Sequence, residues 1–152
     1  LVLLEQPLDR EDLEGLAEIR GKTAIPIAVD ESVRSISDAR QVITQGAADY
    51  VNIKIMKTGL VEAHEIASFI LASGLKLMIG GMVETRVAMG CSFSLVLGMK
   101  GFEILDLDTP LLLGHDPISG GYRYRGPRLL PWQEAGLGMT VSSQDGIRTL
   151  ER

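Results

Sequence analysis

The sequence predicts an α/β fold of about five repeated units, each an apolar run followed by a helical pattern. The runs recur about every 25 residues, and polar side chains follow them at their carboxyl ends. Strands that alternate with helices form parallel units, because a parallel partner strand needs a long crossover connection. Two architectures satisfy this pattern: the C-terminal portion of a closed (β/α)8 barrel, or an open doubly wound sheet.

The individual elements follow from apolar periodicity and from residues that start or stop helices. Asp9 is expected to cap the first helix and Gly21 to end it. Ser35 and Asp38 resemble a capping box at the start of the second helix, which Gly46 stops. The third and fourth helices are expected at about residues 60–73 and 85–97. The predicted strands are residues 2–5, 27–29, 49–54, 75–79 and 102–105.

The pattern changes after residue 108. Pro and Gly become frequent, so residues 109–152 are expected to form loops and short strands that pack over another part of the protein. We therefore predict a partial barrel at residues 1–108 (strands 4–8 of the eight) and a separate C-terminal segment at residues 109–152. The chain opens directly in an apolar run without an initiator Met, which suggests a piece of a longer protein.

Composition limits the possible partners. The net charge is −5 and no basic run exists, which argues against nucleic acid as a partner. No uncharged apolar stretch reaches the roughly 18–20 residues that span a membrane. The single cysteine, Cys91, excludes an internal disulfide framework and is compatible with a cytoplasmic location. His64 and His115 have no partner at metal-ligand spacing, which makes a zinc site unexpected. A homo-oligomer is compatible with all of these features.

Three polar residues stand at the carboxyl ends of successive predicted strands: Glu5, Asp30 and Lys54. In a parallel barrel these ends face one common site. Two converging carboxylates repel each other unless a cation lies between them, and oxygen ligands suit Mg²⁺, or alternatively Mn²⁺. Each acid alone could instead cap the following helix or pair with a surface cation. Together with Lys54, the two acids favour a metal site.

Lys54 suits proton transfer beside such a metal. Burial lowers the pKa of a lysine toward neutrality, where the amine can take and give a proton. A metal-bound carboxylate substrate would lose the proton from its adjacent carbon and form an enediolate. The enolase superfamily pairs a Lys or His base with Mg²⁺ in this way. The alternative is a strand-end lysine whose ammonium reaches solvent.

Asp106 and Asp108 flank Leu107 after the fifth predicted strand. In an extended segment they lie on the same face, because side chains alternate. Two carboxylates on one face could bind the ammonium group of a substrate. The alternative is a turn before Thr109-Pro110, where Asp is common.

Three motifs in register resemble the second half of the barrel of the enolase superfamily, muconate-lactonizing subgroup. They are Glu5-Gln6-Pro7, Asp30-Glu31-Ser32 and the run from Asn52 to Gly59. The resemblance implies that Glu5 and Asp30 bind Mg²⁺ and that Lys54 is one catalytic acid/base. Two further stretches resemble the dipeptide epimerases, such as L-Ala-D/L-Glu epimerases: Gly80–Glu84 and Asp106–Pro110.

The resemblance also implies an isomerase that epimerises a dipeptide. Asp106 and Asp108 would bind the dipeptide's α-ammonium, and Met82, Glu84 and Lys57 would also contact substrate. The family's Lys-x-Lys strand, its first metal-binding Asp and its N-terminal capping domain would all precede residue 1. We therefore expect this chain to be incomplete and inactive alone, with the C-terminal segment packing toward the capping domain.

Two departures from the dipeptide epimerase pattern keep the substrate open. Gly81 stands where many of these enzymes have Cys, and Leu60 replaces a frequent second Gly. The sequence Gly-Gly-Met also occurs in N-acylamino-acid racemases and o-succinylbenzoate synthases, which are the second hypothesis. The third hypothesis is a non-catalytic α/β fragment or binding module.

Overall fold

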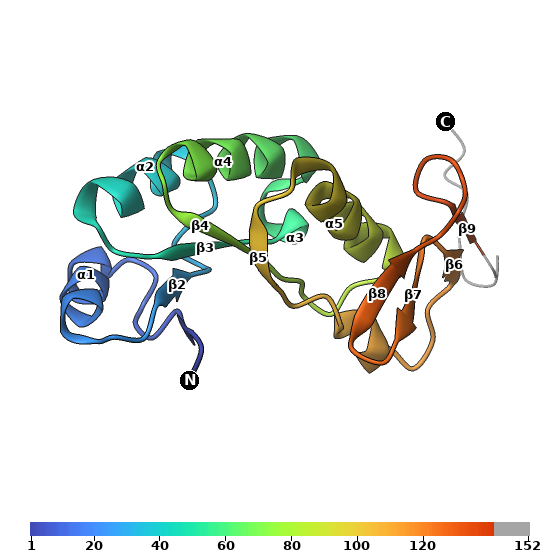
Figure 1. Cartoon of the computed structure of the whole chain (residues 1–152), viewed down its shortest axis with the longest axis horizontal. Coiled ribbons are helices and arrows are strands. Elements are labelled where there is room, and N and C mark those ends of the chain that lie inside the picture. Colours follow the sequence, from blue (N-terminus) through green and yellow to red (C-terminus); the bar gives the residue numbers. More distant parts are fainter. Residues whose placement is uncertain (142–152) are drawn as a thin grey trace, which may run out of the picture.

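The computed structural model describes residues 1–141 and contains a parallel sheet of five strands in the order β1-β2-β3-β4-β5 (Figure 1). The five strands of the sheet are β1 (Leu4–Glu5), β2 (Ile27–Val29), β3 (Tyr50–Ile53), β4 (Lys76–Ile79) and β5 (Phe102–Leu105). The helices are α1 (Leu13–Lys22), α2 (Ile36–Gln45), α3 (Ile55–Thr58), α4 (Leu60–Ala72), α5 (Arg86–Met99) and the 3-10 helix η1 (Thr109–Leu112).

The strand order decides between the two predicted architectures. Each strand pairs with its neighbour in sequence, and all four pairings are parallel. A doubly wound sheet reverses its strand order at a switch point, and this sheet has no reversal. Figure 1 shows α2, α4 and α5 along one side of the sheet, as on the outside of a barrel. The chain therefore forms part of a (β/α)8 barrel.

The apolar core lies between the sheet and these helices. Alternate strand residues face it, among them Val29, Val51 and Leu77, which pair in register and are fully buried. Ala39 of α2 and Ile66 of α4 are buried in the same cluster. Full burial of an aliphatic side chain contributes roughly 1.5–3 kcal/mol, so this layer supplies much of the stability. The other strand face carries polar as well as apolar groups.

The helix boundaries follow the predicted signals with three exceptions. Gly21 was expected to end α1, but the helix continues to Lys22, where its C-cap is Thr23. Ser35 accepts a hydrogen bond from the Asp38 N–H, and Gly46 ends α2 with φ of 64°, both as predicted. Asp9 was expected to cap α1, but Asp12 does so by accepting from the Gly15 N–H at 2.8 Å. Asp9 instead accepts from the Glu11 N–H in the preceding turn. The third exception is the short helix α3, which the sequence did not predict.

The C-terminal segment forms two antiparallel pairs, β6 (Ile118–Gly120) with β9 (Met139–Val141) and β7 (Tyr122–Arg125) with β8 (Arg128–Pro131). Tyr122 anchors this segment: it is fully buried, with its ring 5.9 Å from the Phe93 ring of α5. Tyr124 donates to the Leu107 carbonyl at 2.7 Å. The predicted division at residue 108 stays a prediction, and its residues 142–152 lie outside the described part. Within residues 1–141, no helix is both long and apolar enough to cross a bilayer.

A side-chain amide joins the ends of β1 and β2. The Gln6 Oε1 accepts from the Asp30 N–H at 2.8 Å, and its Nε2 donates to the Leu8 carbonyl and to Ser32 Oγ. Ser32 Oγ in turn donates to the Arg10 carbonyl at 2.7 Å. Gln6 has φ of 38°, a left-handed conformation that is unfavourable for a side chain with a Cβ. The amide contacts therefore hold a strained residue in place directly beside Glu5.

Replacing Gln6 should separate the amide contacts from the backbone strain. We expect Gln6→Ala to lower the free energy of unfolding by about 2 kcal/mol, because a set of partly buried hydrogen bonds is lost while the strain remains. Gln6→Gly should cost less, because glycine adopts positive φ freely. Urea unfolding followed by circular dichroism measures both, with exposed Gln41→Ala as the control. Equal stability of Gln6→Ala and wild type would contradict this account.

Candidate active site at the carboxyl ends of the strands

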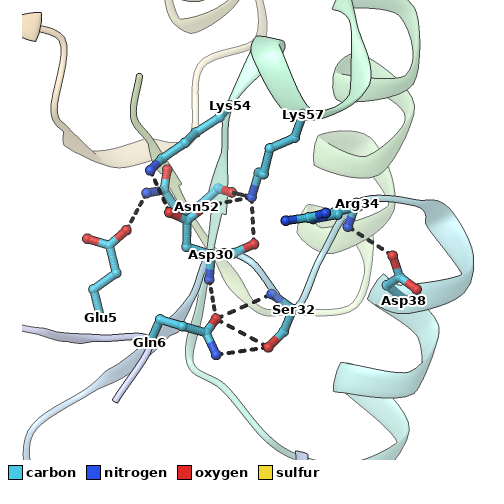
Figure 2. A network of polar contacts seen from close by, with 9 residues as sticks. All are labelled: Glu5, Gln6, Asp30, Ser32, Arg34, Asp38, Asn52, Lys54 and Lys57. Atoms are coloured by element: carbon cyan, nitrogen blue, oxygen red, sulfur yellow. Dashed lines mark hydrogen bonds and ion pairs between the residues drawn. The ribbon is translucent and has the colours of Figure 1, made fainter. Parts of the chain in front are cut away.

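The polar residues predicted from the sequence share the face of the sheet opposite the helices. Side chains alternate along a strand, so Asn52 and Lys54 face the opposite way from Val51. Register places Ala28 beside Tyr50, which puts Asp30, two residues further on, on the same face. Glu5 pairs with Ala28, so its side chain lies on this face as well. Figure 2 shows Glu5, Asp30, Asn52, Lys54 and Lys57 gathered at this end of the sheet.

Asp30 is the centre of the cluster. It is 4% exposed, and each carboxylate oxygen contacts a different lysine. Lys54 Nζ lies 2.5 Å from Asp30 Oδ2, and Lys57 Nζ lies 2.7 Å from Asp30 Oδ1. Burying a charged carboxylate is costly unless it is paired, and two ammonium groups meet that requirement. Burial alone would raise the pKa of Asp30, but the two lysines outweigh it, so the pKa of Asp30 is lowered.

Glu5 is tied to the same cluster through an amide. Asn52 Nδ2 donates to Glu5 Oε1 at 2.6 Å, while the Asn52 carbonyl accepts from Lys57. Asn52 is 1% exposed, and its Oδ1 is buried without a hydrogen-bond partner within the described residues. Sequence reasoning did not single out Asn52 as a site residue. The available signal was its position in β3, two residues before Lys54, which directs both side chains to the same face.

The expected lowering of the Lys54 pKa is wrong for this structure. Burial does act to lower it, but the hydrogen bond and charge of Asp30, with the charges of Glu5 and Glu31, raise the pKa of Lys54 above its ordinary value. The lysine with the lowered pKa is Lys57, because its burial outweighs its attraction to Asp30. The two lysines differ in depth: the side chain of Lys54 is 14% exposed and that of Lys57 is 4% exposed.

The oxygen atoms of this cluster suit a divalent metal in part. Glu5 and Asp30 supply hard carboxylate oxygens on one face at neighbouring strand ends, which fits Mg²⁺ or Mn²⁺. The buried, unpartnered Asn52 Oδ1 adds a further oxygen beside them. Within residues 1–141, no three His, Cys, Asp or Glu side chains are grouped to hold a metal. These residues therefore fit part of a magnesium site, whose remaining ligands would come from outside this group.

A bulge turns Asp106 toward the same face. In the β4–β5 pairing, Leu77 faces Phe102 but Met78 faces Ile104, so Glu103 is an extra residue in β5. Because of this shift, Asp106 faces the same side of the sheet as Ile104 and Met78, and not the side that the helices cover. Burial raises the pKa of Asp106, as do the charge and hydrogen bond of Asp108, while the charge of Lys54 lowers it. Asp106 and Asp108 are both exposed.

The loop after β4 carries the other two predicted substrate contacts. Met82 is 46% exposed, whereas Glu84 is 6% exposed. Glu84 Oε1 accepts from the Met82 N–H at 2.8 Å, and its Oε2 is buried without a hydrogen-bond partner among residues 1–141. Burial raises the pKa of Glu84, against the opposing effects of the Met82 N–H and Lys54. A Cβ at Gly81 would lie 2.2 Å from the Met89 methyl and 3.0 Å from Glu84 Oε1, so this loop packs tightly.

The raised pKa of Glu84 gives a pH dependence of stability. The folded state holds a proton on Glu84 at a higher pH than the unfolded state does. Stability is therefore greatest below the unfolded pKa and falls as pH rises through the folded value. Glu84→Gln keeps an acceptor for the Met82 N–H and removes this titration. We expect wild type to lose stability relative to Glu84→Gln as pH increases from about 4 to 7.

Unfolding in urea across this pH range checks the expectation. Exposed Glu65→Gln in α4 serves as the control, and its difference from wild type should stay flat over the same range. A flat difference for Glu84→Gln as well would contradict the raised pKa.

Known proteins are similar in sequence to most of this chain. An L-Ala-D/L-amino acid epimerase from Populus trichocarpa is 48% identical over 129 residues, covering 82% of this chain and 31% of that protein. An N-succinyl-L-Arg/Lys racemase from Bacillus cereus is 34% identical over 148 residues, covering 97% and 39%. The chain thus spans less than half the length of these relatives.

A solved structure gives the same result. A dipeptide epimerase from Enterococcus faecalis V583, complexed with Mg and the dipeptide L-Leu-L-Tyr, aligns with a TM-score of 0.86 and 35% identity. The alignment covers 92% of this chain and 40% of that one. The family model described as "Enolase C-terminal domain-like" matches residues 1–145. The chain belongs to this family, within the enolase superfamily that its strand-end motifs predicted.

Proposed function

We propose that this chain supplies the C-terminal part of a Mg²⁺-dependent epimerase that acts on dipeptides. Residues 1–108 would contribute strands 4–8 of its barrel, and residues 109–152 the segment that packs toward a capping domain. The proposal rests mainly on the ion pair between Lys54 and Asp30. Glu5 lies on the same face of the sheet, and Asp106 follows β5 at the same end of the sheet. The dipeptide epimerases among the similar proteins support the substrate class.

In this proposal Lys54 moves a proton at the α-carbon of the C-terminal residue. As a neutral amine it would take the α-proton, and the electrons of the broken C–H bond would move toward the substrate carboxylate. As an ammonium it would return a proton to that carbon. A second base on the opposite face would complete the inversion, and we place it in the N-terminal half of the whole enzyme. The raised pKa of Lys54 supports the proton-delivering form in the structure described.

The remaining residues would bind and orient the substrate. Glu5 and Asp30 would hold Mg²⁺, which would supply positive charge next to the substrate carboxylate and so acidify the α-proton. Asp106 and Asp108 would bind the α-ammonium by charge-assisted hydrogen bonds. Met82, exposed in the loop after β4, would contact a side chain of the dipeptide. Glu84, buried beneath the same loop, would support it from below.

Deuterium exchange tests the proposed reaction. The full-length enzyme is incubated with L-Ala-L-Glu and other dipeptides in D₂O, and the α-proton signal is followed by NMR. We expect deuterium at the α-carbon of the C-terminal residue. Lys54→Ala should slow exchange by about 10²- to 10⁴-fold, the usual contribution of a general acid or base. Exposed Lys22→Ala is the matched control. No exchange with any dipeptide would exclude the class, and unchanged exchange in Lys54→Ala would remove Lys54 from the mechanism.

Racemisation of N-acylamino acids is the second candidate, favoured by the similarity to the N-succinyl-L-Arg/Lys racemase. Its substrates lack a free α-ammonium, so the carboxylates after β5 separate the two functions. We expect Asp108→Asn to lower kcat/KM for dipeptides by about 10- to 100-fold, because a hydrogen bond between charged groups is lost. Activity on N-succinyl amino acids should hardly change in the same variant. Unchanged activity on dipeptides, with reduced activity on N-succinyl amino acids, would favour the racemase.

A further inference from the structure

Lys57 occupies a position that substrate contact does not explain. It lies on α3, three residues after Lys54, which is the N-cap of that helix, and both ammonium groups contact the same carboxylate. Its side chain is 4% exposed. A lysine ammonium has three N–H donors, and three acceptors surround this one: Asp30 Oδ1 at 2.7 Å, the Asp30 carbonyl at 2.6 Å and the Asn52 carbonyl at 2.8 Å. No donor remains for a substrate.

These contacts constrain Asp30 in two ways. The bonds to two carbonyls tie the end of β2 to the end of β3, which fixes the backbone that carries the carboxylate. The bond to Oδ1 then fixes the rotation of the carboxylate itself, so Oδ2 is the oxygen directed at Lys54 (Figure 2). Groups that hold a metal ligand in this manner typically affect metal affinity by 10- to 100-fold when they are removed.

We propose that Lys57 is a positioning residue for Asp30 and not a substrate contact. By holding Oδ1, it fixes the carboxylate so that Oδ2, which is paired with Lys54 in this structure, is the oxygen that would bind the divalent metal. The proposal rests on the proposed function, because it takes Asp30 as a metal ligand. An alternative role, in which Lys57 binds the dipeptide carboxylate, would need an exposed ammonium with a free donor. A purely structural role would need no consequence for the metal. Metal affinity measured without substrate therefore distinguishes the three.

The experiment uses the full-length enzyme and Mn²⁺ as the probe, with bound metal counted by electron paramagnetic resonance. Lys57→Met keeps the length of the side chain and removes the charge and the donors. We expect Mn²⁺ to bind about 10- to 100-fold more weakly to this variant. Lys76→Met is the control, because it removes the same charge from an exposed lysine at the opposite end of the sheet. Its Mn²⁺ affinity should equal that of wild type.

The outcomes separate this inference from the proposed function. If wild type binds no Mn²⁺, the proposed metal site itself fails. If wild type and Lys57→Met bind Mn²⁺ equally, and only the KM for dipeptide rises in the variant, Lys57 is a substrate contact and the inference is overturned. Equal Mn²⁺ affinity with an unchanged KM and a lowered melting temperature would overturn it in favour of a structural role.

A second measurement needs no variant and covers the case in which Lys57→Met does not fold. Wild type is treated with an acetylating reagent, and the modified lysines are identified by mass spectrometry. We expect Lys57 to react much more slowly than Lys22, whose side chain is 72% exposed, with or without dipeptide. Fast acetylation of Lys57 that only dipeptide suppresses would overturn the inference.

Discussion

The carboxyl end of this sheet depends on one buried charge, the carboxylate of Asp30. An isolated carboxylate in that position would be strongly unfavourable, so the surrounding chain must supply its partners. Lys54 and Lys57 each take one oxygen, and Gln6 binds the Asp30 N–H from the neighbouring strand end. The loops after β1, β2 and β3 thus meet at a single residue. Removing either lysine would leave the charge less well compensated, which is why these contacts form one unit.

The fold brings these residues together through two simple rules. Consecutive parallel strands bring their carboxyl ends to one edge, and alternation selects which residues face inward. The rules place Glu5, Asp30 and Lys54 without any special geometry. Asp106 is the exception, because regular pairing would have turned it toward the helices. The bulge at Glu103 turns Asp106 to the face that carries the other polar residues. Tyr50 and Lys76 both donate hydrogen bonds to the Glu103 carboxylate.

The sequence predicted the fold and the family, because both rest on patterns that repeat along the chain. Five apolar runs with helical stretches between them marked the strands, and capping residues such as Ser35 and Gly46 marked helix ends. It did not predict α3, the bulge or the cap at Asp12, because each depends on one local choice between near-equal alternatives. The pKa of Lys54 was mispredicted for a different reason. Burial is readable from a strand pattern, whereas a contact with Asp30 requires three dimensions. The individual site roles stay predictions.

The balance of charge explains why a second lysine stands so close to the first. Glu5 and Asp30 carry two negative charges, and Lys54 and Lys57 carry two positive ones. Lys57 is held by three hydrogen bonds, to the Asp30 carboxylate and carbonyl and to the Asn52 carbonyl, so its ammonium stays beside Asp30 when Lys54 moves. Lys54 has a single close contact to Asp30 and greater exposure than Lys57, so in the proposed reaction it is the lysine that would reach the substrate while Asp30 remains paired with Lys57. If Lys54 transfers a proton as proposed, Lys57 would keep the buried Asp30 carboxylate paired throughout the reaction.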